Sequence, residues 1–511
     1  MTAAAGEAAQ ERDIAALARG GRTNFFGFLL RLLARIPFLF IASRLYGASA
    51  LGRFASALVM VEFAGMIATL GQKRGLAQRL AAGDEHPANA VADAFLLGTL
   101  IALSASALIY AFPASMYPKC NFGLSDHLLV LAVWPLALGD LALAALAYRF
   151  DVATTVRARA VVEPWVLSIA AGALFFIAVP DDWWLAALLH PGAGLPIAYV
   201  LSTYAATGVA LVALYRAYGM PKRWRLNPLR LHGLAMANLP LALADAVEWG
   251  TRKLDVFVLR FFVGEAPLGI YYFAQQFASL PQKLKTSFEP VLGPVITRNV
   301  RERNYGAIAR QVCQVGFWIT AAQAGIALAL AIPGAGLMGL GGPDFVIGTA
   351  SLMFLLAAEV VAATAVVSEA ALVYLARYRN LVVSLFTIVL QAILTIGGIR
   401  LVTLLGLGAR WQIAAAAAAL MVTLASASLL KSVLLARLLG ERINNWRWSL
   451  AWAAIPAVAV GLVAKFTLPE WAEILLGMPA ILAVYVWIIW HKGFGPEDRM
   501  LFRKTLPEPA P

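Results

Sequence analysis

Residues 89–112 read NAVADAFLLGTLIALSASALIYAF, and Asp93 is the only charged side chain among these 24 residues. A helix of about 20 apolar residues spans the hydrocarbon core of a bilayer, because each residue rises about 1.5 Å. The chain contains about fourteen such stretches, separated by short loops. They lie near residues 25–46, 53–70, 89–112, 127–149, 162–180, 196–216, 234–262, 267–297, 306–332, 346–376, 380–400, 411–436, 448–466 and 474–490. The sequence therefore predicts an all-α, polytopic membrane protein without a water-soluble domain.

The composition is also that of a membrane protein. Hydrophobic residues make up 61% of the chain and charged residues 14%, and the mean hydropathy is +0.76. A soluble domain carries about 25% charged residues. The net charge of +13 is also typical of nucleic-acid-binding proteins. However, the basic residues lie mostly in short membrane-flanking loops, where membrane topology and anionic lipids account for them. We therefore expect no nucleic-acid partner.

Lysine and arginine are divided unequally between the two sides of the membrane. From the N-terminal tail through alternate loops, and including adjoining span ends, 28 of the 41 lie on one side and 7 on the other. Cytoplasmic loops retain Lys and Arg, so this pattern predicts cytoplasmic termini and an even number of spans. The other six lie inside apolar stretches, where charge is costly and function is expected. They are Arg31, Arg35, Arg252, Lys253, Lys283 and Lys285.

A short motif occurs twice in the chain. Residues 47–54 read GASALGRF, and residues 264–271, which follow at an offset of 217, read GEAPLGIY. The first glycines, Gly47 and Gly264, can adopt the positive φ of a tight turn, whereas Gly52 and Gly269 permit close helix packing. Six predicted spans separate the copies, so the two halves have the same orientation. This indicates a parallel repeat about an axis along the membrane normal, with substrate in the cleft between the halves.

The repeat sets the predicted domain organisation. Two pseudo-symmetric lobes of six spans each surround a central cavity, and two accessory spans follow them. The predicted segments are a cytoplasmic tail at 1–24, an N-terminal lobe at 25–216, a cytoplasmic inter-lobe loop at 217–233, a C-terminal lobe at 234–437, accessory spans at 438–490 and a cytoplasmic tail at 491–511.

Several short sequences around this repeat resemble those of one protein family. They are Arg44-Leu45-Tyr46-Gly47, Leu51-Gly52-Arg53-Phe54, Leu70-Gly71 followed by Arg74 and Arg79, and the stretch from Asp255 to Tyr271. These are similar to the signatures of polysaccharide-biosynthesis flippases of the multidrug/oligosaccharidyl-lipid/polysaccharide exporter (MOP) superfamily. The resemblance implies a flippase for lipid-linked oligosaccharides in the bacterial cytoplasmic membrane. It further implies that the two lobes rock about a cationic cavity, and that the last two spans line a lipid-tail groove.

The expected substrate is an undecaprenyl-diphosphate-linked oligosaccharide, a repeat unit of polysaccharide or lipopolysaccharide. A diphosphate needs several donors in a low-dielectric cavity, and the arginine fork suits it. The six cations named above are therefore the candidate binding residues. Arg31 and Arg35 are four residues apart and share one helix face, although snorkelling to the membrane surface is an alternative role for them.

Acidic residues inside the predicted spans form a second group of candidates. Asp245, Glu248, Arg252 and Asp255 occupy an arc of about 80° on one helix, so they face protein or a wet cavity. An alternative is a purely structural ion network. Transport coupled to H⁺, to Na⁺ or to the membrane potential is expected, with no other cofactor and no metal site. The candidates for ion coupling are Glu62, Asp140, Asp245, Glu248, Asp255, Glu359 and Glu369.

Other functions predict different sequences. A cation-coupled multidrug exporter of the same superfamily needs an acidic cavity, whereas the charges here are mixed. A lipid II flippase stays an alternative. A membrane O-antigen polymerase or ligase needs a large outside loop, and we find none in the sequence, so no catalytic residue or enzymatic activity is expected. The expected partners are the polyprenyl-diphosphate-linked glycan, membrane lipids, and polysaccharide polymerase and export proteins.

Overall fold

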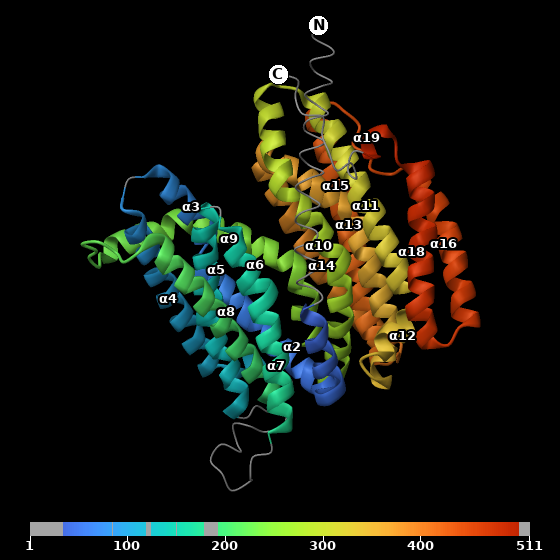
Figure 1. The fold of residues 1–511 in the computed structure, drawn as a ribbon, viewed down its shortest axis with the longest axis horizontal. Coiled ribbons are helices and arrows are strands. Elements are labelled where there is room, and N and C mark those ends of the chain that lie inside the picture. Colours follow the sequence, from blue (N-terminus) through green and yellow to red (C-terminus); the bar gives the residue numbers. More distant parts are fainter. Residues whose placement is uncertain (1–33, 84, 119–123, 150, 178–192, 500–511) are drawn as a thin grey trace. The chain divides into compact units, whose positions relative to one another are not determined.

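The computed structural model describes residues 34–83, 85–118, 124–149, 151–177 and 193–499, without the side chains of 124–126, 152, 283–295, 297 and 496–497. The regular elements of this part are all helical (Figure 1). Eleven of its helical segments are long and apolar enough to cross a membrane, which confirms the predicted polytopic, all-α protein. The first of them, Ala34–Ala82, covers more than one predicted span, and α9 (Pro228–Leu259) and α10 (Glu265–Arg301) are not among the eleven. The count of fourteen therefore stays a prediction.

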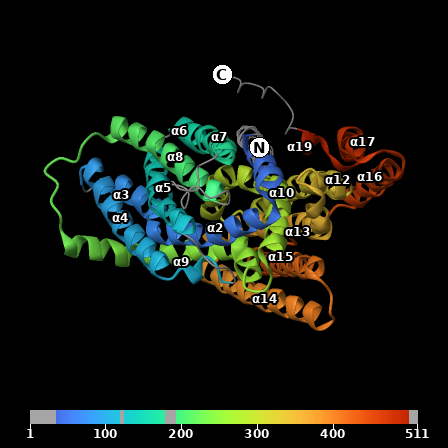
Figure 2. The same ribbon diagram turned by 90° about the horizontal axis from the view of Figure 1, so that it is seen from below.

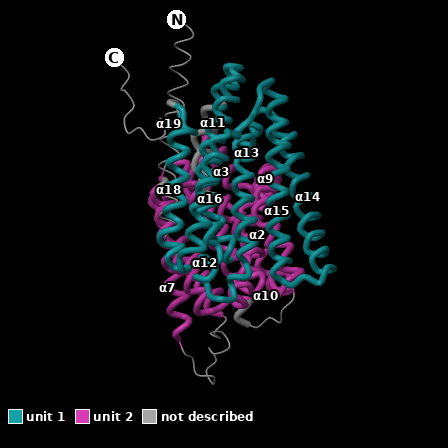
Figure 3. The backbone as a smooth tube through the Cα atoms, turned by 90° about the vertical axis from the view of Figure 1, so that its right-hand side faces the viewer, with its two compact units in different colours: residues 1–28, 273–511 teal, residues 29–272 magenta. Residues whose placement is uncertain are grey.

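The chain forms two compact units, coloured separately in Figure 3. Unit 2 is Leu29–Tyr272, and unit 1 contains the rest of the chain. The elements of unit 2 are η1 (Ala42–Tyr46), α2 (Gly47–Thr69), α3 (Gln72–Ala82), α4 (Pro87–Ala111), η2 (Pro113–Ser115), η3 (Leu124–Ala132), α5 (Val133–Tyr148), α6 (Val152–Val156), η4 (Arg157–Val162), α7 (Glu163–Phe176), α8 (Gly194–Tyr218), α9 and the start of α10.

Small residues set the packing within unit 2. One buried core joins α3, α4, α5 and α8, and seven of its thirteen residues are alanine. Leu76 and Leu146 fill the space that these alanines leave. Small side chains let helix backbones approach closely, which is how helices associate in lipid, where no hydrophobic effect drives them together.

Two glycines let α9 lie against α2 and α3. A β-carbon on Gly71, where φ is +67°, would lie 2.5 Å from the backbone nitrogen of Ala242. A β-carbon on Gly75 would lie 2.0 Å from the Asn238 side chain. Since α9 packs on α2, α3 and α4, the division between units falls at 272/273. The predicted lobe boundary was instead the loop at 217–233.

Unit 1 contains the remaining part of α10 and the helices that follow. Seen from below, α14 lies along α15 (Figure 2). The elements are α11 (Tyr305–Ala331), α12 (Gly334–Gly339), η6 (Pro343–Gly348), α13 (Thr349–Leu375), α14 (Arg377–Leu404), α15 (Ala409–Leu439), α16 (Trp448–Thr467), α17 (Glu470–Ala472), η7 (Glu473–Gly477), α18 (Met478–Ile488), η8 (Ile489–Gly493) and α19 (Pro496–Arg499).

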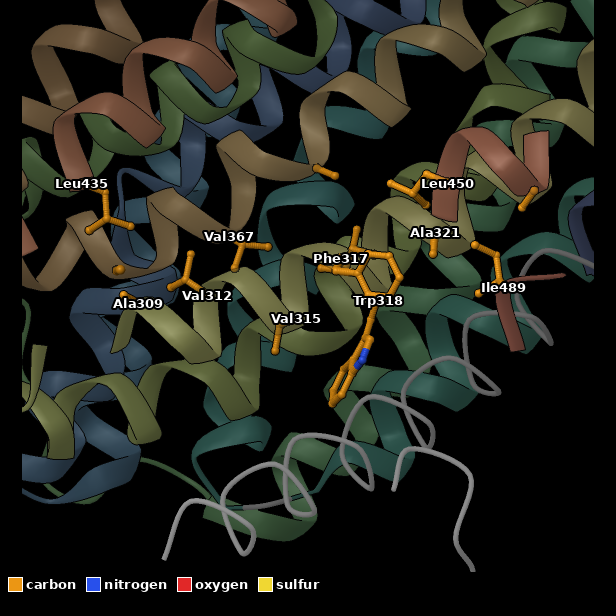
Figure 4. Packing of buried hydrophobic residues seen from close by; sticks show 14 of the residues in the cluster. Ala309, Val312, Val315, Phe317, Trp318, Ala321, Val367, Leu435, Leu450 and Ile489 are labelled. Carbon is orange, nitrogen blue, oxygen red and sulfur yellow. The ribbon is translucent and has the colours of Figure 1, made fainter. Parts of the chain in front are cut away.

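Helix α11 is central to the core of unit 1 (Figure 4). Its buried Phe317 and Trp318 share one cluster with Val367 of α13 and Leu435 of α15. The predicted accessory helices join the same cluster, for example through Leu450 of α16. These last helices therefore pack as an integral part of unit 1.

Candidate functional site

The two copies of the repeated motif pack against each other inside unit 2. A β-carbon on Gly52 would lie 1.8 Å from the carbonyl oxygen of Glu265, and one on Gly269 would lie 2.0 Å from that of Ala48. Both positions therefore require glycine, as the predicted close packing demands. Arg53 strengthens the contact, because its Nη1 lies 3.1 Å from Oε1 of Glu265.

The positive φ predicted for the first glycine of the motif occurs in one of the two copies only. Gly47 has a φ of +82°, directly before the first turn of α2. Gly264 does not have a positive φ, so that prediction is wrong. Gly264 lies at the N-cap of α10, where its carbonyl accepts the N–H of Leu268. An N-cap residue ordinarily has an extended rather than a left-handed backbone.

A cluster of charges joins α3 to α9. Nη2 of Arg74 lies 3.7 Å from Oδ1 of Asp245 and 3.2 Å from Oε2 of Glu248. Nη2 of Arg252 lies 2.9 Å from the other carboxylate oxygen of Glu248. Glu248 thus binds two guanidinium groups, and the i, i+4 pair expected from the sequence is present. We call Arg74, Asp245, Glu248 and Arg252 the α3–α9 cluster.

A second cluster lies on α3, α5, η4 and α7. Asp140 binds Nζ of Lys73 at 2.5 Å and also binds Arg159. Arg159 in turn donates to Glu163 at 2.8 Å, and Arg35 lies 3.5 Å from the same carboxylate. These five charges form a chain in which cations and anions alternate. Arg159 lies in η4, and such π-helical turns occur often at functional sites.

A third group includes Lys253, whose Nζ lies 3.1 Å from Oε2 of Glu62. The hydroxyls of Tyr199 and Tyr272 both interact electrostatically with Glu62. Asp255 is fully buried, accepts the Tyr271 hydroxyl at 2.6 Å and interacts electrostatically with Lys253. Within the stripe predicted on α9, Asp245, Glu248 and Arg252 therefore belong to the α3–α9 cluster, whereas Asp255 binds Tyr271.

Within both clusters, individual side chains differ in exposure. The side chains of Arg74, Glu248 and Arg35 are 53%, 47% and 41% exposed, whereas those of Arg159 and Glu163 are 16% and 6% exposed. An exposed guanidinium can exchange its carboxylate partner for a phosphate at little cost in desolvation. A buried pair loses much more when its partner is removed, because a buried charge is then left alone.

The other predicted residues have other partners or are not described. In unit 1, Glu359 accepts a hydrogen bond from Gln282 at 3.2 Å, and Glu369 lies 2.9 Å from Nζ of Lys431. The sequence pattern assigns Lys431 to a flanking loop, but it is buried in α15. Three of the candidate cations fall outside this description: Arg31 lies outside the described residues, and the side chains of Lys283 and Lys285 are not described.

Sequence reasoning missed four members of the clusters. Lys73, Arg74 and Arg159 resemble ordinary loop cations because each lies near the end of an apolar stretch, and Glu163 lies at the start of one. The i, i+4 spacing of Arg159 and Glu163 is a signal that could have identified this pair. The signature Leu70-Gly71 also lies only three residues before Arg74.

Comparison with known proteins identifies the family. Residues 41–321 match the family described as polysaccharide biosynthesis protein. The chain belongs to this family. Apart from Arg35, this span contains the repeated motif and all three groups of charges, and it confirms the resemblance found in the sequence. No curated protein matches the chain.

Solved structures identify the fold of this family member. An inward-facing multidrug resistance MATE family transporter of the MOP superfamily is 14% identical, with a TM-score of 0.59, over 83% of this chain and 94% of that one. The lipid II flippase MurJ, in an inward closed conformation, is 12% identical, with a TM-score of 0.62, over 92% and 99%. A mutant of the Vibrio cholerae MATE transporter VcmN is 13% identical, with a TM-score of 0.57, over 83% and 98%. The chain is thus a multi-pass membrane protein with a fold like that of MOP-superfamily transporters.

Proposed function

We propose that this protein is a flippase that moves an undecaprenyl-diphosphate-linked oligosaccharide across the bacterial cytoplasmic membrane by alternating access. Its family and fold support transport of a glycan precursor. The observation that carries the proposal is the α3–α9 cluster. It contains two arginines that are 53% and 36% exposed, and both are bound to carboxylates that an incoming diphosphate can displace.

The mechanism follows from this arrangement. Arg74 and Arg252 share Glu248, so each guanidinium keeps donors available for a second acceptor. A diphosphate accepts several of these charge-assisted bonds at once, while the released carboxylates stay near Lys73 and other cations. No bond is made or broken, and the protein lowers the cost of taking a charged headgroup out of water.

A multidrug exporter is the main competing function, because the MATE transporters share this fold. The first of these structures is of a multidrug resistance transporter, and cationic drugs need unpaired acids. In the described part of unit 2, Asp245 and Glu248 both have arginine partners, and Glu62 has a lysine partner. This pairing favours an anionic substrate over a cationic one.

Complementation of a strain that lacks its glycan flippase tests the proposal. We expect the wild type to restore surface glycan, and Arg252→Ala, Arg74→Ala or Arg35→Ala to reach the membrane but reduce export. Each lost charge-assisted bond is worth about 1.5–3 kcal/mol, or roughly a 10- to 150-fold change. Arg400→Ala, which alters an exposed cation of α14 in unit 1, is the matched control and retains export. Full export by the Arg74→Ala/Arg252→Ala double variant would overturn the proposal. It would also be overturned if the wild type gave the strain drug resistance but did not restore surface glycan.

A further inference from the structure

We propose that the strap between α8 and α9 binds anionic phospholipid headgroups at the cytoplasmic membrane surface. The strap is residues 219–227, GMPKRWRLN, and it is the green loop that joins these two helices in Figure 2. The unequal distribution of Lys and Arg predicts this loop on the cytoplasmic side. The proposal rests on the strap itself and does not depend on which substrate is transported.

Hydrogen bonds to α4 fix the depth of the strap. The side chain of Asn89 donates to the carbonyl oxygen of Lys222 and accepts its backbone N–H, both at 3.0 Å. The indole Nε1 of Trp224 donates to Asp93 at 2.8 Å. Asn89 and Asp93 lie in the first two turns of a candidate membrane span, Pro87–Ala111. The strap therefore lies at the level where that span begins, which is the height of the lipid headgroups.

The cations of the strap are available to bind an anion. Lys222, Arg223 and Arg225 are all exposed, and no carboxylate of the described residues lies within ion-pair distance of them. The neighbouring Arg230 is different, because it binds both Glu85 and Asp93. Among the described residues, the acids near the strap, Glu85 and Asp93, are thus engaged by Arg230 and Arg79, and none of the described acids forms an ion pair with the three exposed strap cations.

Apolar side chains alternate with these cations. Met220 is 68% exposed, Leu226 is 62% exposed, and Leu229, in the first turn of α9, is 84% exposed. Exposed apolar groups at headgroup level enter the boundary between headgroups and acyl chains, while neighbouring cations bind lipid phosphates. A soluble protein partner would not explain why the strap lies at the level of the headgroups and combines exposed cations with exposed apolar side chains. The cytoplasmic leaflet supplies anionic headgroups for the cations and acyl chains for the apolar side chains.

Lipid binding by the purified full-length protein tests the proposal directly. Native mass spectrometry measures binding of added phosphatidylglycerol and phosphatidylcholine. We expect wild type to prefer phosphatidylglycerol. Lys222→Gln/Arg223→Gln/Arg225→Gln should weaken that binding by about two orders of magnitude, from roughly a fivefold change per cation. The charge-conserving variant Lys222→Arg/Arg223→Lys/Arg225→Lys should retain it.

The control removes two exposed cations elsewhere, Arg400→Gln/Arg410→Gln, and should bind phosphatidylglycerol like wild type. Equal phosphatidylglycerol affinity of the neutralised strap and wild type would overturn the proposal. An equal loss of phosphatidylglycerol binding in the control variant would also overturn the proposal. A preference for an added soluble protein over lipid would assign the strap to a protein interface instead. Because binding is measured without transport, this outcome is independent of the flippase assay.

Discussion

Gly52 shows how a single hydrogen atom in place of a methyl group decides packing. A β-carbon there would overlap the backbone of Glu265, which cannot rotate away. Gly52→Ala should therefore destabilise the protein by about 1–3 kcal/mol or more, although alanine favours helix by about 1 kcal/mol. The matched control is Gly208→Ala in α8, where a β-carbon meets nothing within 4 Å. Thermal unfolding of both purified variants in detergent is the measurement. Equal midpoints for the two variants would contradict the assigned role of Gly52.

Arg159 and Arg74 are both arginines in ion pairs, but their exposure differs. Arg159 is 16% exposed and lies between two carboxylates. Arg159→Gln should therefore lower the free energy of unfolding by about 3 kcal/mol, which is the lower end of the range for breaking a buried ion pair. Lys73 and Arg35 still hold those carboxylates, which limits the loss. Arg74 is 53% exposed, so Arg74→Gln should lower the free energy of unfolding by only about 0–1 kcal/mol. Unfolding midpoints and membrane levels measure both effects, and a reversed order would refute this division between structure and binding.

These residues also show where sequence reasoning stops. Charges in the middle of an apolar stretch, such as Glu62, Arg252 and Lys253, stand out because burial there is costly. Charges at the end of a stretch, such as Arg159, look like ordinary membrane-flanking cations. Only tertiary packing shows that its partners include Asp140, nineteen positions away along the chain. Periodicity in the sequence identifies neighbours within one helix, whereas contacts between helices can be identified only from the tertiary structure.

At the scale of elements, apolar length predicted the long helices well. For example, the stretches expected at 306–332 and 448–466 correspond to α11 and α16. The short helix α3 was not predicted, because it has only eleven residues and contains Gln72, Lys73, Arg74, Gln78 and Arg79. Its apolar Leu76 and Leu80 are buried in one core with residues of α4, α5 and α8. Tertiary contacts commonly stabilise such short amphipathic helices, which propensity alone leaves marginal.

Helix α19 offers a pH prediction. Burial raises the pKa of Asp498, but hydrogen bonds from Arg447, Gly495 and Trp318 outweigh it and hold the pKa below its ordinary value. A lowered folded-state pKa contributes stability at pH values above the ordinary carboxyl pKa of about 3.9. That contribution is lost as the pH falls through the folded-state pKa. We expect the unfolding midpoint of wild type to fall towards that of Asp498→Asn in this acidic range. A constant difference between them down to pH 3 would contradict the assignment.

At the scale of the whole molecule, the orientation in the membrane follows from the distribution of Lys and Arg. It places both Arg223 of the strap and Arg303 in the cytoplasm, and it places the turn between α14 and α15 outside. All three regions contain exposed residues, and Leu405 in that turn is 64% exposed. Single cysteines at positions 223, 303 and 405, in a chain whose native Cys120 and Cys313 are replaced, test this in intact cells. A membrane-impermeant thiol reagent should label position 405 alone, and permeabilised cells should then show labelling at all three. Labelling of position 223 from outside would reverse the orientation, and with it the assignment of the strap to the cytoplasmic leaflet.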